Sequence, residues 1–142
     1  MVEDQNFHKV KKIIYVLILF FVFASKSYSQ NFKLEKLVNL DSPWGSSFIN
    51  SNEIIITEKS GKIKIVNILS REVQEISHQL NFVVHGQGGL LDIIHKDNNI
   101  WISYTEDRGG YKTSTSIARA EFNKKQLNFK NIFQANPPID SG

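Results

Sequence analysis

The sequence has 142 residues, no cysteine and a formal net charge of +3 at pH 7. The lack of cysteine excludes disulfides, thiolate metal sites and lipid attachment through an N-terminal cysteine. Four lysines and two acidic residues in the first 29 positions contribute +2, which leaves +1 for the remaining chain. No basic cluster survives beyond these positions, so a nucleic-acid surface is not indicated.

Residues 1–29 have the order of an export signal. The basic segment "HKVKK" precedes the apolar run Ile13–Ala24, and Ser27 and Ser29 place small residues at −3 and −1 before Gln30. The run is shorter than the roughly 20 residues of a membrane-spanning helix. We therefore expect cleavage between Ser29 and Gln30 and a mature periplasmic or secreted protein without membrane contact. An uncleaved anchor is the alternative.

The chain after this leader is typical of an all-β protein. No long stretch repeats apolar residues at helical spacing, and short β-rich runs are separated by Gly, Asn, Asp and Ser. The glycine-containing segments "EKSG" and "EDRGGYK" predict hairpin turns. We expect strands at residues 33–40, 46–50, 53–57, 62–68, 73–77, 90–94, 99–105, 114–122 and 127–133.

The expected strands recur about every ten residues, which fits a sandwich, a barrel or a propeller. A four-stranded propeller blade takes about 40–45 residues, so residues 33–80 and 89–133 would each make one blade. Two blades cannot close a ring and would leave sheet edges open. The sequence also stops in the turn-like segment "PPIDSG". We therefore expect residues 30–142 to be the N-terminal part of a truncated, larger domain.

The segment "HGQGGLLD", residues 85–92, contains three glycines around Gln87. Glycine permits positive φ and close approach of another backbone or a flat ligand. The glutamine amide offers donors and an acceptor that match sugar hydroxyls. Gln87 is therefore a candidate pocket residue, with a solvated side chain on an ordinary glycine turn as the alternative. A phosphate cradle is disfavoured, because neither Gly-Lys-Ser/Thr nor a helix start follows.

Six segments occur in the order of a known family: "LDSPWGSSFI", "IIITEKSGKIKIV", "VVHGQGGLLDI", "NIWISYTE", "IARAEF" and "IFQANPPIDSG". In these segments the sequence resembles the glucose/sorbosone dehydrogenase family, and within it the soluble periplasmic aldose sugar dehydrogenases that use pyrroloquinoline quinone. The resemblance implies a six-bladed β-propeller, of which this chain covers about the first two blades. It also implies oxidation of the anomeric carbon of an aldose to a lactone, an external electron acceptor, and calcium that holds and polarises the quinone.

The same resemblance assigns Gln87 to the sugar and quinone pocket. The general base of the family is a histidine in a His-Phe-Gly-type motif, which is expected beyond Gly142. The calcium ligands and the basic residues that bind the quinone are expected later still, so no metal ligand is assigned within this chain. None of its four histidines sits in the required motif.

Three further residues carry weaker expectations. Trp44 is expected to pack between blades rather than form a ligand platform. Glu58 is expected to be solvated in a hairpin turn. Asp92 interrupts an apolar strand, and a buried carboxylate needs partners. We therefore expect it to bind backbone or Ser/Thr groups, with a catalytic role as the alternative.

The last strands add three more expectations. Residues 97–99, Asp-Asn-Asn, are expected to form a turn, because the spacing of a known calcium loop is absent. Trp101 and Tyr104 are interpreted as blade packing. Arg119 is expected to span a blade edge, with a position facing the central pocket as the alternative.

The leading hypothesis is an exported quinone-dependent aldose dehydrogenase, of which this chain is an N-terminal fragment without the catalytic base. One alternative is a non-catalytic exported propeller that binds a sugar or a protein partner. Another is a lactonase-type propeller hydrolase, which needs carboxylate and asparagine metal ligands.

Overall fold

The structure is a computed structural model that describes residues 11–12, 14–15 and 32–140. The chain divides into two units, residues 1–35 and 36–142. In the first unit the four described residues of the leader are helical. No helix of the described residues is long and apolar enough to span a membrane. The predicted cleavage site between Ser29 and Gln30 lies outside the described residues, and cleavage there stays a prediction.

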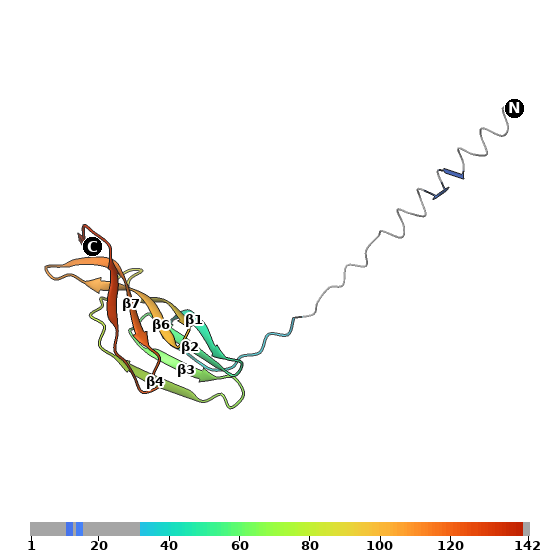
Figure 1. The fold of residues 1–142 in the computed structure, drawn as a ribbon, viewed down its shortest axis with the longest axis horizontal. Coiled ribbons are helices and arrows are strands. Elements are labelled where there is room, and N and C mark those ends of the chain that lie inside the picture. Colours follow the sequence, from blue (N-terminus) through green and yellow to red (C-terminus); the bar gives the residue numbers. More distant parts are fainter. Residues whose placement is uncertain (1–10, 13, 16–31, 141–142) are drawn as a thin grey trace. The chain divides into compact units, whose positions relative to one another are not determined.

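The second unit begins with an antiparallel meander (Figure 1). Its strands form because apolar residues alternate with polar ones, as in β3, where Ile63 and Ile65 are buried and Lys64 lies on the other face. The short turn at residues 58–61 confirms the hairpin predicted from "EKSG". The four strands are β1 (Pro43–Asn50), β2 (Glu53–Glu58), β3 (Ile63–Asn67) and β4 (Val73–His78).

A second sheet follows the same plan. Asp97 and Asn98 have φ angles of 50° and 58°, the left-handed backbone of a tight hairpin, which confirms the predicted turn. β9 and β10 pair with different parts of β7 and together occupy the place of one edge strand. The strands are β5 (Leu90–Lys96), β6 (Asn99–Asp107), β7 (Lys112–Glu121), β9 (Lys130–Gln134) and β10 (Ile139–Asp140).

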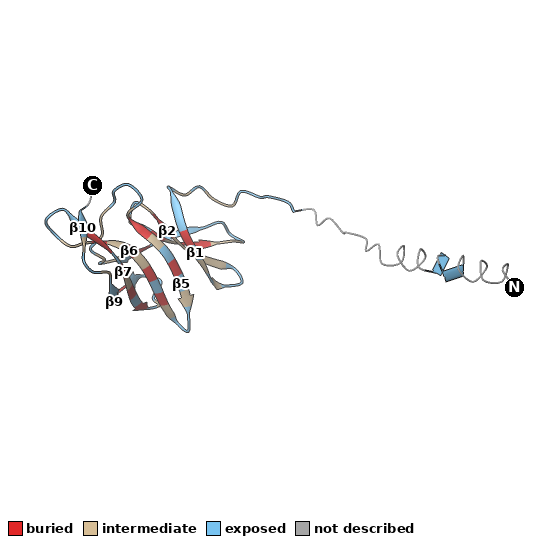
Figure 2. Ribbon diagram, turned by 90° about the horizontal axis from the view of Figure 1, so that it is seen from above, coloured by how far each residue is buried: buried red, intermediate tan, exposed pale blue. Residues whose placement is uncertain are grey.

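The hydrophobic core lies between the two sheets. In β5, β6 and β7 buried positions recur along the strands between more exposed ones (Figure 2). Each fully buried aliphatic side chain contributes about 1.5–3 kcal/mol relative to an exposed one, so this cluster unites the two sheets. It includes Ile55, Ile63, Ile65 and Ile76 of the first sheet and Leu90, Ile93, Ile100, Ile102 and Tyr104 of the second.

A close backbone approach joins β1, β2 and β5. The buried hydroxyl of Thr57 accepts a hydrogen bond from the Gly45 amide at 3.0 Å and donates one to the Leu91 carbonyl at 2.6 Å. A Cβ atom on Gly45 would lie 2.7 Å from the Asp92 Cα atom. Only glycine fits at this position, because any side chain would collide with the β5 backbone. This contact explains the glycine of the "PWG" segment.

Residues 123–129, which we call the strap, leave the second sheet and cover the edge of the first. Within the strap, β8 (Gln126–Leu127) pairs in parallel with β4. The Gln79 side chain donates to the Phe129 carbonyl at 2.8 Å and accepts from its amide at 3.2 Å. Leu127 is fully buried. The strap thus protects an edge strand that would otherwise be open to pairing.

The strand predicted at residues 33–40 is wrong, because residues 32–40 contain no strand. Leu34 is 98% exposed, and the loose alternation of this segment finds no neighbouring strand in the described chain. The first strand instead begins at Pro43. The single strand predicted at 127–133 is also wrong, because residues 128–129 belong to no strand and separate β8 from β9.

Replacing Thr57 with valine tests the junction of the sheets. Valine keeps the shape but leaves the Gly45 amide and the Leu91 carbonyl without their side-chain partner. We expect the free energy of unfolding of the complete gene product to fall by about 1–3 kcal/mol, measured by urea denaturation. The same change at the exposed Thr115 is the control, and an equal effect at both positions would contradict the role of Thr57.

Candidate functional site

Gln87 lies in the loop that connects β4 to β5, at the end of the unit where β2 ends and β7 begins. The Gly88 amide donates to the His85 carbonyl at 2.6 Å, which closes a tight turn around Gln87. The Thr105 amide of β6 donates to the Gly89 carbonyl, and the Thr105 carbonyl accepts from the Val83 amide, both at 2.9 Å. The second sheet therefore holds the loop on both sides of Gln87.

The first sheet holds the same loop through Lys59. The ammonium group of Lys59 donates to the Gly86 carbonyl. Gly89 has a φ of +145°, and a Cβ atom there would lie 2.3 Å from the Lys59 carbonyl oxygen. This position therefore demands glycine for both conformation and space. The close passage of the loop past Lys59 explains Gly89, and the positive φ of 51° explains Gly86, where a Cβ atom would meet no other atom.

The Gln87 side chain is exposed and borders a hollow of about 380 Å³. No hydrogen bond from its amide to another side chain or to the backbone is found in the part of the chain that the structure describes. Such an amide retains two donors and an acceptor for a ligand. Other lining residues include His85, Leu91, Thr105, Ser114, Ile139 and Asp140.

Glu58 is not the solvated turn residue that the sequence predicts. It ends β2, its side chain is fully buried, and it accepts hydrogen bonds from the Lys64 ammonium at 2.7 Å and from the Asp41 amide at 2.7 Å. The second carboxylate oxygen is buried without a partner among the described residues. The prediction fails for two reasons. The tight β2–β3 hairpin brings the Lys64 ammonium to the Glu58 carboxylate, and the segment before β1, which includes Asp41, covers that carboxylate.

The Glu58 carboxyl remains ionised in this setting. Burial alone would raise the pKa of Glu58, but the hydrogen bond from Lys64 and that from the Asp41 amide outweigh it, so that the pKa lies below its ordinary value. The pair fixes the end of β2, and the next residue, Lys59, holds the glycine loop. Glu58 is therefore a structural support of the candidate site that the sequence reading missed.

Two other sequence expectations can be compared with the structure. Asp92 is exposed, so the expected burial is wrong, whereas the expected bond to a backbone group is confirmed, because the carboxylate accepts from the Ile93 amide at 2.9 Å. A bulge between Leu90 and Ile93 breaks the alternation that would have turned Asp92 inward. Trp44 is 49% exposed and is not enclosed between the two described sheets, so its expected packing between blades stays a prediction.

Trp101 and Tyr104 lie on opposite faces of β6, because they are three residues apart on a strand. Tyr104 is buried in the core, which confirms its packing role, whereas Trp101 is on the outer face. The Arg119 guanidinium lies 5.3 Å from the centre of the Trp101 ring and donates to the Asn99 side chain at 2.9 Å. Arg119 does not line the Gln87 hollow.

A second buried carboxylate, Glu106, also escaped the sequence reading. It accepts hydrogen bonds from the Ser116 hydroxyl at 2.6 Å, the Asn131 amide at 2.9 Å and the Gln134 amide at 2.7 Å. These partners tie β6 and β7 to the edge strand β9. Every second residue of β6 points into the core, and Glu106 continues the series of Ile102 and Tyr104. This alternation is the sequence signal that could have identified Glu106 as buried.

Residues 40–142 match the family described as Glucose / Sorbosone dehydrogenase. The chain belongs to this family. Among curated relatives of the chain, aldose sugar dehydrogenase YliI of Escherichia coli (strain K12) is 27% identical over 112 residues. An uncharacterized protein of Synechocystis, slr1608, is 34% identical over 101 residues. The chain spans 30% and 24% of the lengths of these two proteins, and the alignments include 72% and 62% of the chain.

Solved structures share the fold of this chain. The soluble aldose sugar dehydrogenase of Escherichia coli, in its apo-form, superposes with a TM-score of 0.66 at 26% identity, over 72% of this chain and 32% of that one. The aldose sugar dehydrogenase of Streptomyces coelicolor, in a form bound to pyrroloquinoline quinone (PQQ), gives a TM-score of 0.60 at 20% identity, over 70% and 32%. The two sheets are thus blades of a β-propeller, which confirms the predicted fold class.

Replacing Glu58 with glutamine tests the buried pair. The Lys64 charge would remain with little solvent contact, so we expect the complete gene product to lose about 3 kcal/mol of stability at pH 7. Because the pKa of Glu58 is lower in the folded than in the unfolded protein, the ionised carboxylate stabilises the fold at pH values above the unfolded pKa of about 4.3. This stabilisation is lost as the pH falls through the pKa of the folded protein. The difference between the two proteins should therefore shrink below about pH 4.

Denaturation at a series of pH values measures this difference. Glu75→Gln is the matched control, because the Glu75–Lys62 pair is 3.7 Å long and its side chains are 56% and 53% exposed. Its loss should cost less than about 1 kcal/mol. A Glu58→Gln effect that is equally small, or that does not change with pH, would contradict the assigned pair.

Proposed function

We propose that the complete gene product containing this chain is exported and oxidises the anomeric carbon of aldose sugars to lactones. PQQ is the proposed cofactor, and an external acceptor takes up the electrons. Family membership supports this proposal, and so do the names of the relatives. The observation that carries it within this chain is the unpaired amide of Gln87, which is held over a hollow by a loop that both blades fix.

The residues of the hollow fit part of such a ligand. Gln87 can donate to a quinone or sugar oxygen, and the turn from Gly86 to Gly89 leaves room for a flat ring to approach. No lysine or arginine lines the hollow in the described chain. We propose that the carboxylates of the quinone are paired by cations from other parts of the complete gene product.

In this proposal the described residues bind and orient rather than transfer protons. Gln87 holds a sugar hydroxyl or quinone oxygen in place, while Lys59 and Thr105 prevent the loop from moving. When bound, PQQ would accept the hydride, so that the cofactor supplies the redox chemistry. A glutamine amide has no titration near neutral pH and cannot be the base. The proposed base is a histidine outside this chain.

Calcium is proposed as the second cofactor by the same family resemblance. It prefers carboxylate and carbonyl oxygens. Within the described residues no three His, Cys, Asp or Glu side chains cluster in a way that could hold a metal ion. We therefore propose that its ligands, like the base, lie elsewhere in the complete gene product.

An activity assay tests the proposed reaction. The complete gene product and the 142-residue chain are each mixed with PQQ and calcium, and dye reduction is followed with a panel of aldoses. We expect turnover only from the complete gene product. No turnover with any aldose would contradict the dehydrogenase proposal. Turnover by the 142-residue chain above the free-cofactor background would show that the base lies within it, with His85 as the histidine of the hollow.

Replacing Gln87 with alanine tests the proposed binding residue. One net hydrogen bond is worth about 0.5–1.5 kcal/mol, so we expect kcat/KM to fall about 2- to 12-fold. The melting temperature should be unchanged, because the side chain is exposed. Gln79→Ala, in the same loop but bonded to the strap, should reduce stability instead. Unchanged kinetics of the Gln87 variant with several aldoses would remove it from the site.

A further inference from the structure

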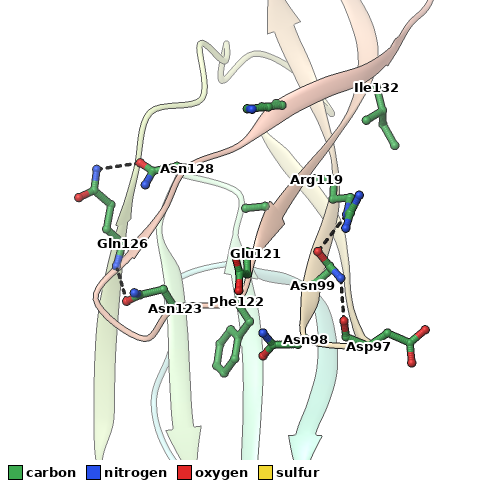
Figure 3. Close-up of a pocket in the computed structure, with 12 residues that line it drawn as sticks. Asp97, Asn98, Asn99, Arg119, Glu121, Phe122, Asn123, Gln126, Asn128 and Ile132 are labelled. Carbon is green, nitrogen blue, oxygen red and sulfur yellow. Dashed lines mark hydrogen bonds between the residues drawn. The ribbon is translucent and has the colours of Figure 1, made fainter.

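A larger hollow, of about 830 Å³, lies at the other end of the two-blade unit. One wall is formed by the β5–β6 turn and the end of β7, and the other by the strap and the start of β9. Figure 3 shows Arg119 and Asn99 on one side of this hollow and Asn123, Gln126 and Asn128 on the other. None of the residues around this hollow lines the one at Gln87, so the two are separate.

The lining of this hollow is rich in side-chain amides. Amides present a donor and an acceptor side by side, as sugar hydroxyl groups require. The hollow also has an apolar surface at Phe122, whose ring packs on His95 at a centroid distance of 5.0 Å. A mixture of an apolar wall and a few placed polar groups is typical of ligand sites. The five amides are those of Asn98, Asn99, Asn123, Gln126 and Asn128.

The charges in this hollow balance. Arg119 and Lys130 contribute two cations, and Asp97 and Glu121 contribute two carboxylates. No ion pair joins any of these four side chains to another within the described residues. A strongly anionic or cationic ligand therefore gains no net attraction here, whereas a neutral polyhydroxylated ligand meets charged and neutral hydrogen-bonding groups from both walls.

Both walls are held in place without a ligand. Asn99 accepts from Arg119 at 2.9 Å and donates to the Asp97 carbonyl at 2.7 Å. Gln126 donates to Asn128 at 3.1 Å. The strap itself is fixed to the first blade, where Lys124 reaches Glu53 at 2.6 Å. A site whose side chains are ordered in advance loses less entropy on binding.

We propose that this hollow is a second carbohydrate-binding site, for a neutral oligosaccharide, separate from the hollow at Gln87. Arg119 and Asn128 supply hydrogen bonds from opposite walls, and Phe122 supplies the apolar surface against which the C–H face of a sugar ring packs. This site binds sugar without oxidising it, and its assignment does not depend on the proposed dehydrogenase activity.

Saturation-transfer NMR on the complete gene product tests this site with sucrose, trehalose and raffinose. These sugars have no free anomeric hydroxyl and cannot be substrates of an aldose dehydrogenase. We expect saturation transfer at millimolar concentrations. Arg119→Gln and Asn128→Ala should each weaken binding about three- to tenfold, the loss of one net hydrogen bond. Gln87→Ala should leave binding unchanged, as should Asn39→Ala, which removes an exposed amide outside both hollows.

Three results would overturn the proposal. The first is an absence of saturation transfer from the unmodified protein to all three sugars. The second is binding that Arg119→Gln and Asn128→Ala leave unchanged. The third is binding that Gln87→Ala abolishes, because it would place these sugars in the hollow at the other end. Circular dichroism of each variant checks that the fold is retained. We expect no change for Arg119→Gln and Asn128→Ala, because both side chains are exposed.

Discussion

The organisation of the two blades depends on the close contact at which the Thr57 hydroxyl bridges Gly45 and Leu91. The backbones of Gly45 and Asp92 lie so close at this contact that a Cβ atom on Gly45 would not fit. The two Thr57 hydrogen bonds set the distance of β1 and β2 from β5. The core closes around that spacing. Lys59, two residues after Thr57, can then hold a loop that belongs to the next blade. The position of Gln87 is thus a consequence of how two sheets pack.

The two ends of the unit are held by different means. At one end, a buried ion pair and two backbone hydrogen bonds fix a glycine loop that leaves an amide unpaired. At the other end, the strap crosses from the second blade to the outer edge of the first and encloses a polar hollow. The glycine loop is fixed by both blades, and the strap is fixed by the blade next to the one it leaves. These contacts explain why irregular segments can position side chains here.

Much of the fold could be predicted from the sequence because strand alternation and turn residues are local signals. The Lys-Ile alternation of β3 and the Asp97–Asn98 turn are clear cases. Glu58 could not be placed in this way, because its burial depends on Lys64 across a hairpin and on a covering segment. Asp92 was misplaced because a bulge changes strand phase without a sequence marker. Gln87 was predicted from its glycines and a family resemblance, and its role stays a prediction. The amide-lined hollow could not be predicted, because it joins segments that only the strap brings together.

The central claim is that Gln87 binds the reacting ligands from a loop held between two blades. A crystal structure of the complete gene product with PQQ and an aldose tests it most directly. We predict the Gln87 amide within about 3 Å of a quinone or sugar oxygen, with Lys59 and Thr105 still bonded to the loop. A quinone bound elsewhere, with the Gln87 side chain in solvent, would contradict the account.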